Sequence, residues 1–136
     1  MKKYDEKNIF LKIIKNEIPC IKVYEDSSVL AIMDAFPTAP GHILVLPKDQ
    51  SRNIIDINTE DLKKLMLAVQ KIAQAQKIAF KADGIKIQHN CEEAGGQVIF
   101  HTHVHIIPFY KEENENLMAK TDAGQQAEIL KKYLKN

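Results

Sequence analysis

Apolar residues recur with the period of an α-helix in three parts of the chain. The first covers residues 8–15, where lysines occupy the side opposite the apolar positions. The second is a long helix capped at Asn58 or the next residue, and we expect Gly84 to end it. The third lies in a tail of about residues 122–135, with Asp122 as its N-terminal cap. The pattern therefore predicts one long helix and short helices near both ends.

Between these helices, five segments carry the apolar pattern of β-strands. Residues 21–25 and 29–33 flank the turn formers Asp26 and Ser27, which predicts a hairpin. Further strands are expected over residues 42–46, 85–90 and about 100–109. Strands with few helices between them favour an α+β fold, in which helices cover an antiparallel sheet, over a doubly wound parallel sheet.

Three segments are expected to be loops. Residues 34–41 contain two prolines and Gly41, which exclude regular structure there. Residues 91–96 are polar and carry paired glycines, and residues 112–116 are acidic and amide-rich. We expect the last of these segments to be a solvent-exposed loop.

The bulk properties narrow the class of protein. A length of 136 residues predicts one domain, and 19 basic against 18 acidic residues leave a formal charge of +1. Such a balance provides no general attraction to nucleic acid or anionic membrane, so any anion specificity must come from a local site. The cysteines Cys20 and Cys91 are too few for a disulfide framework, and we expect reduced thiols. With no signal-like or membrane-spanning run in the sequence, the cytoplasm is the expected location.

A histidine cluster is the strongest candidate for chemistry. Three of the five histidines, His101, His103 and His105, occupy alternate positions. Alternate residues of a strand share a face, so we expect the three imidazoles on one side, with Val104 and Ile106 directed into the core. A row of imidazoles is unfavourable in an apolar core, which favours a functional site.

Two kinds of site fit this spacing. Zinc is often bound by histidines, and His42 or His89 could complete a metal site. A nucleophilic histidine fits the spacing almost equally well. Gly95 and Gly96 precede the cluster, and paired glycines let backbone N–H groups approach an anion closely. This adjacency favours a phosphate over a metal ion.

At this point the sequence resembles the histidine triad (HIT) family, whose signature is His-φ-His-φ-His-φ-φ, with φ apolar. The signature stands here as residues 101–107, with Thr102 as the one less apolar member. The resemblance covers a core of about residues 8–109 within a single domain of residues 1–136, and the tail adds no landmark. Further matching segments are 10–19, 23–26, Asp34, 40–48 and 95–97.

The resemblance implies a five-stranded antiparallel sheet with a long helix and short flanking helices, assembled as a homodimer. It also implies hydrolysis or transfer at the α-phosphate of a nucleotide conjugate. The reaction would pass through a nucleotidyl-histidine intermediate and release a nucleoside monophosphate, as in a nucleoside phosphoramidase. No cofactor is needed for this chemistry, because a neutral imidazole is available near pH 7.

Roles follow from the resemblance position by position. His103 would be the nucleophile, His42 an additional active-site histidine, and His101 and His105 would orient and polarise the phosphate. Asp34 would bind the ribose hydroxyls. Ribose or phosphate contacts would come from Asn90 and Gln97, beside the loop of Gly95, Gly96 and Val98. Phe10, Ile13 and Ile18 would line the base pocket, although plain core packing fits Ile13 and Ile18 nearly as well.

Two departures from the family pattern affect the expectation. Many members have Ser or Thr where this chain has Val98, so a hydroxyl near the phosphate is missing and turnover is in question. Some bacterial relatives bind zinc through Cys-x-x-Cys near the first helix, but residues 5–11 contain no cysteine, so we predict no structural zinc. Two alternatives stay open: a catalytically weak nucleotide-binding module and a histidine-ligated zinc protein.

Overall fold

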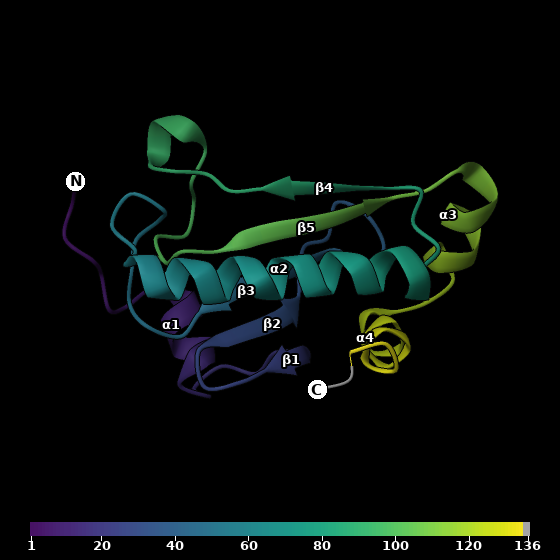
Figure 1. The fold of residues 1–136 in the computed structure, drawn as a ribbon, viewed down its shortest axis with the longest axis horizontal. Helices are drawn as coiled ribbons and strands as arrows, with labels where there is room; N and C mark the ends of the chain where they lie inside the picture. The colour runs from purple at the N-terminus through teal and green to yellow at the C-terminus, as the bar shows by residue number, and fades with distance from the viewer. Residues whose placement is uncertain (135–136) are drawn as a thin grey trace.

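A long helix crosses one face of a five-stranded antiparallel sheet in the computed structural model, which describes residues 1–134 (Figure 1). The strands follow the order β1-β2-β3-β5-β4, and this arrangement confirms the predicted α+β fold. None of the helices in residues 1–134 has the length and apolar character needed to cross a membrane. The elements are α1 (Ile9–Ile14), β1 (Lys22–Glu25), β2 (Val29–Met33), β3 (Ile43–Pro47), α2 (Thr59–Ala79), β4 (Gly84–Gln88), the 3-10 turn η1 (Glu93–Gly95), β5 (Val104–Phe109), α3 (Glu112–Ala119) and α4 (Ala123–Lys131).

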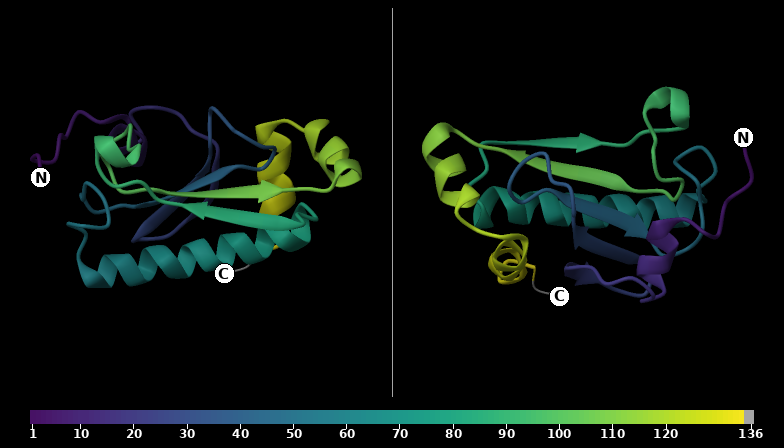
Figure 2. Two further views of the ribbon diagram at one scale, coloured as in Figure 1. Left: turned by 90° about the horizontal axis from the view of Figure 1, so that it is seen from above. Right: turned by 180° about the vertical axis from the view of Figure 1, so that it is seen from behind.

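The sheet has a separate apolar core on each face. Strands β2 and β3 are buried along their whole length, and successive residues of each strand join alternate cores. Figure 2 shows α2 on one face and α1 on the other. The α2 face contains Val29, Ala31, Ile43, Val45, Val104 and Ile106 with Leu65, Val69 and Ile72. The α1 face contains Leu30, Ile32, Leu44 and Leu46 with Phe10 and Ile13.

The long helix begins where the sequence predicts and ends earlier. Asn58 caps it, because its side chain accepts a hydrogen bond from the backbone N–H of Asp61. The prediction that Gly84 ends the helix is wrong. The C-cap is Phe80, and Lys81 takes the left-handed conformation with φ 56°, so the chain has already turned when Gly84 opens β4.

The segment after β5 also differs from expectation. Residues 112–116, expected to be an exposed loop, begin helix α3, whose first turn is acidic and therefore complements the positive end of the helix dipole. The predicted tail helix is confirmed as α4, where Asp122 and Gln125 form a reciprocal capping box. The end of the predicted tail, Lys135, lies outside the described residues.

The last strand starts later than predicted. Ladder pairing of β5 begins at Val104, so the first two histidines of the triad precede the strand. Instead, Thr102 donates its backbone N–H to the Ser51 carbonyl. The neighbouring strand β3 ends at Pro47, which has no N–H to extend the ladder. The expectation of three imidazoles alternating along one strand is therefore wrong for His101.

Gly41 provides a stability test of the loop that leads into β3. Its φ is 86°, and an added Cβ would lie 2.7 Å from Phe80 Cε2. We expect Gly41→Ala to lower the free energy of unfolding by about 2–3 kcal/mol, from backbone strain and overpacking together. Urea denaturation measures the effect. Gly84→Ala is the control, because an added Cβ there meets nothing within 4 Å; equal losses in both variants would contradict the prediction.

Candidate active site

A pocket of about 700 Å³ opens on the α1 face of the sheet. Helix α1 and the strands beneath it supply an apolar wall, and the polar groups gather where β5 begins. A pocket with one apolar part and a few convergent polar groups is typical of a small-molecule site. The apolar wall includes Ile9, Phe10, Ile13, Pro19, Ile32, Leu44 and Ile99, and the polar lining includes Asp34, Gln88, Asn90, His103 and His105.

His103 is held in one tautomer. Its Nδ1–H donates to the backbone carbonyl of His101 at 2.7 Å, so Nε2 keeps its lone pair. The ring stands edge-on to Phe10, with 4.8 Å between ring centroids, and only 7% of the residue is exposed. Burial lowers the pKa of His103 from 6.5 to about 4. The imidazole is therefore neutral at pH 7, with an unprotonated Nε2.

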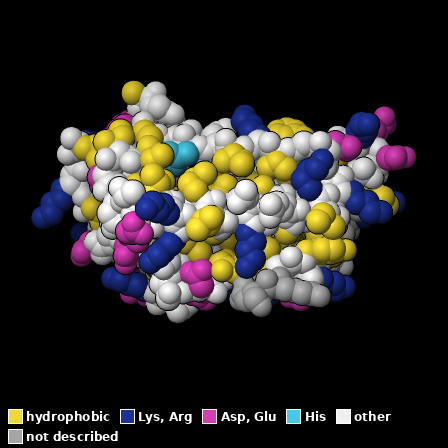
Figure 3. Space-filling view, in the orientation of Figure 1, with side chains coloured by type: hydrophobic (Ala, Val, Ile, Leu, Met, Phe, Trp, Pro, Cys, Tyr) yellow, Lys and Arg dark blue, Asp and Glu magenta, His cyan; other side chains and the backbone are white. Residues whose placement is uncertain are grey.

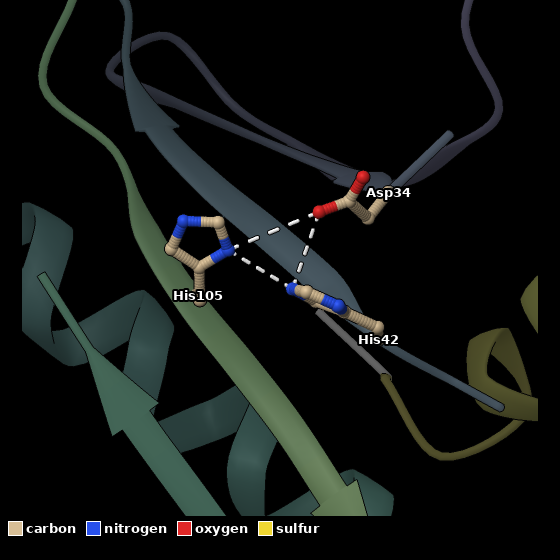
Figure 4. Close-up of side chains that lie close together, drawn as sticks. All are labelled: Asp34, His42 and His105. Atoms are coloured by element: carbon tan, nitrogen blue, oxygen red, sulfur yellow. Dashed lines mark hydrogen bonds and ion pairs between the residues drawn. The ribbon is translucent and has the colours of Figure 1, made fainter. Parts of the chain in front are cut away.

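A second group of side chains lies beside His103; its members Asp34 and His105 line the pocket, and His42 is buried. His105 Nδ1 lies 3.0 Å from His42 Nε2, which lies 3.2 Å from Asp34 Oδ2 (Figure 4). Thr38 donates its backbone N–H to His42 Nδ1, so the proton of neutral His42 resides on Nε2. Burial lowers the pKa of both histidines, and the Asp34 carboxylate opposes this by favouring the protonated form.

The same three side chains have the spacing of a metal site. Within residues 1–134, the ligand atoms of Asp34, His42 and His105 form a group in which all lie within 4.8 Å of one another. A metal ion would need the lone pair of His42 Nε2, where the bond from Thr38 puts the proton. The hydrogen bonds therefore favour a proton-sharing group over a set of metal ligands.

His101 lies behind the pocket. It is completely buried, donates Nε2–H to the Pro47 carbonyl at 2.8 Å, and accepts at Nδ1 from the Tyr4 hydroxyl at 2.6 Å. Asn8 donates in turn to the Tyr4 hydroxyl. Because the backbone carbonyl of His101 fixes the ring of His103, this histidine supports the site from its rear wall.

His89 has a role that sequence reasoning missed. Its Nδ1–H donates to the backbone carbonyl of His103 at 2.8 Å, and its Nε2 accepts from the backbone N–H of Ile54 at 3.0 Å. His89 therefore holds the backbone of His103 from the side of β4. The sequence suggested His89 only as a possible metal ligand, because neither bond leaves a signal in the pattern of residues.

The glycine loop differs from the expected anion cradle. The backbone N–H groups of Gly95, Gly96 and Gln97 all bond to carbonyls of Glu92 or Glu93 at 3.0 Å. These donors are occupied by the turn η1 and do not face an anion. The backbone N–H of Val98 has no partner among residues 1–134, and this residue is 82% exposed at the pocket.

The other predicted binding residues fall into two groups. Asp34, Asn90, Phe10 and Ile13 line the pocket, together with Gly96 and Val98. Gln97 is buried, and its side-chain amide bonds only to protein groups around the 51–53 and 92–99 loops. Ile18 packs against the α1-face core, in agreement with the plain-core alternative.

The chain matches the model of the HIT domain over residues 15–112. It belongs to the HIT family. A solved HIT-like protein from Bartonella henselae, described as involved in cell-cycle regulation, is 45% identical; the match covers 97% of this chain and all of the other, with a TM-score of 0.88. A histidine triad nucleotide-binding protein from Sulfolobus tokodaii is 31% identical, with 92% and 90% covered and a TM-score of 0.79. The adenylylsulfatase HINT3 of Arabidopsis thaliana is 39% identical over 74% of this HIT chain and 51% of its own length.

The buried imidazole of His103 predicts acid sensitivity. Its pKa is about 4 in the folded state and about 6.5 unfolded, so the unfolded HIT chain binds more protons as the pH falls. The stabilisation is complete above pH 6.5 and decreases as the pH falls toward 4. We expect His103 alone to remove about 2 kcal/mol of the free energy of unfolding between pH 7 and pH 5.

Urea denaturation at the two pH values measures this loss. His103→Gln should reduce the difference between pH 7 and pH 5, since the variant has no imidazole to titrate at this position. An identical pH dependence in wild type and variant would show that His103 is not the group responsible.

Proposed function

We propose that this HIT protein is a nucleotide hydrolase or transferase that acts at the α-phosphate of nucleotide conjugates through a nucleotidyl intermediate on His103. The observation that carries the proposal is the lone pair of His103 Nε2, held at the edge of the pocket by the bond from Nδ1–H to the His101 carbonyl. An uncharged nucleophile suits a phosphorus atom that is surrounded by negative oxygens.

The reaction would proceed in two displacements. His103 Nε2 forms a bond to the α-phosphorus while the bond to the leaving group breaks, and the leaving group takes the bonding electron pair. The bound phosphate and Asp34 both favour a protonated form of the His42–His105 pair, which transfers one proton to the leaving group through His105. A water molecule then returns a proton to the neutral pair as its oxygen displaces His103, and the nucleoside monophosphate is released.

The pocket supports a nucleotide as the ligand. Phe10 and Ile13 offer an apolar wall to a base, and Asp34 offers a carboxylate to ribose hydroxyls. The Val98 N–H, which has no partner in the described part of the chain, and the Asn90 side chain lie at the same pocket and would contact the phosphate. The Arabidopsis relative named adenylylsulfatase makes adenylate conjugates the first substrates to test.

A catalytically weak nucleotide-binding module is the second candidate. Val98 favours it, since the pocket here has an exposed isopropyl group where many relatives place a hydroxyl. The two functions differ in a single-turnover experiment with an adenosine phosphoramidate. Binding of AMP without release of the amine would favour the module.

Strand β4 is the basis for proposing a homodimer. It forms one edge of the sheet, where backbone groups remain unpaired by another strand. One flank of α2 borders Tyr24 of β1 and carries Leu67, Ala68 and Lys71. Met66 therefore lies on the opposite flank of the helix, toward β4. With Ile87 half exposed on β4, an apolar surface runs over α2 and β4 (Figure 3). Two copies joined along these edges would bury it.

His103→Ala tests the reaction. We expect turnover of an adenosine phosphoramidate to fall by at least about 10³-fold, because the nucleophile is removed, while AMP binding persists through the rest of the pocket. Mass spectrometry after a brief acid quench should find an AMP adduct on His103 in the wild type. Undiminished turnover in the variant, or an adduct mapped to another residue, would overturn the mechanism.

Charge placed on the proposed dimer surface tests the assembly. We expect wild type to elute with the mass of two chains and the double variant Met66→Asp/Ile87→Asp with the mass of one, since buried unpaired carboxylates are strongly unfavourable. Light scattering after size exclusion measures the masses. Leu67→Asp is the matched control, because it adds the same charge on the other flank of α2; a single-chain mass for wild type would reject the dimer.

A further inference from the structure

The peptides on either side of Gly41, just before His42, are held by side chains from parts of the chain distant in sequence. The backbone N–H of Gly41 donates to Gln126 Oε1 of α4 at 3.1 Å. Gln76 of α2 donates to the Gly41 carbonyl at 3.0 Å, and the Tyr110 hydroxyl donates to the Pro40 carbonyl at 2.6 Å. Three separate segments of the chain therefore bond to one short turn.

The two glutamines are buried, which makes these bonds costly to maintain. Gln76 is completely buried, and its Oε1 has no hydrogen-bond partner among residues 1–134. Gln126 is 7% exposed and uses its Nε2 on the carbonyl and hydroxyl of Thr121. An apolar residue would avoid the desolvation of a buried amide. Core packing alone therefore does not explain why glutamines occupy these two buried positions.

The turn determines where His42 lies. Asp34 donates its backbone N–H to the His42 carbonyl, and His42 donates its own N–H to the Ala39 carbonyl at 3.2 Å. These bonds fix the backbone N–H and carbonyl of His42, and its Nδ1 accepts from Thr38. The position of the His42 ring therefore depends on the turn at Gly41. A rotation of the Gly41 peptide would move His42 Nε2 away from Asp34 and His105.

We propose that Gln126 is a positioning residue for the proposed reaction and that helix α4 completes the active site by fixing the Gly41 peptide behind His42. The proposal rests on the proposed function and extends it to the C-terminal tail, which carries no family landmark. Ala123, at the start of the same helix, lines the pocket itself. The tail therefore contributes to the site in two ways: Ala123 lines the pocket, and Gln126 accepts a hydrogen bond from Gly41.

The alternative is that Gln126 serves only to join α3 to α4 through Thr121. That structural role would make the variant less stable without changing the reaction at temperatures well below unfolding. It would also leave the tautomer of His42 unchanged. A positioning role would change both the reaction and the tautomer of His42, because it acts on the bonds between His42 and its partners.

The experiment compares three variants of the full chain. Gln126→Leu removes the acceptor for the Gly41 N–H, and Gln126→Glu keeps an oxygen acceptor at this position. Glu128→Leu is the control, because it also introduces a leucine on α4, at an exposed position whose side chain pairs only with Lys131. The readouts are single-turnover rate, AMP affinity, hydrogen exchange of the Gly41 amide, and imidazole ¹⁵N shifts of His42.

We expect Gln126→Leu to slow the single-turnover rate by between about tenfold and a hundredfold with AMP affinity changed less than about threefold. Exchange of the Gly41 amide should accelerate, and the His42 shifts should move toward mixed tautomers. Gln126→Glu should restore much of the rate, and Glu128→Leu should leave all four readouts as in wild type. Unchanged exchange and shifts in Gln126→Leu would overturn the proposal. If wild type itself releases no product, the proposed function fails, while exchange and shifts still decide the role of Gln126.

Discussion

The hydrogen bond from His103 Nδ1–H to the His101 carbonyl is the constraint on which the site depends. It selects the tautomer that leaves Nε2 unprotonated, and burial beside Phe10 keeps that imidazole neutral. A ring free to exchange tautomers would present a proton to the pocket for part of the time. The bond is useful only because its acceptor cannot move. Much of the surrounding structure serves to fix that acceptor.

The groups that hold this carbonyl in place do not line the pocket. The side chain of His101 is tied to Pro47 and Tyr4, and His89 holds the carbonyl of His103 from the opposite direction. On the other side of the site, buried glutamines hold the turn before His42. The structure thus has two imidazoles that line the pocket and a larger set of buried polar groups that orient them.

Sequence reasoning recovered the sheet, the N-terminal caps of the long helix and the tail helix, and several residues that face the pocket, because these follow from local periodicity and from the triad motif. It failed where a distant segment decides the outcome. His101 and His105 look equivalent in the motif, yet Pro47 on another strand ends the ladder and leaves His101 in the rear wall. The paired glycines suggested free donors, but carbonyls of the same loop occupy them. Helix α3 was missed because its acidic residues resemble those of an exposed loop.

The bond between Tyr4 and His101 joins residues 97 positions apart. Closing so long a loop carries an entropic cost that only later contacts repay. During synthesis, Tyr4 leaves the ribosome well before His101, so the bond between them forms only after the triad segment has emerged. The rear wall of the pocket is therefore complete only once these 97 further residues have been made.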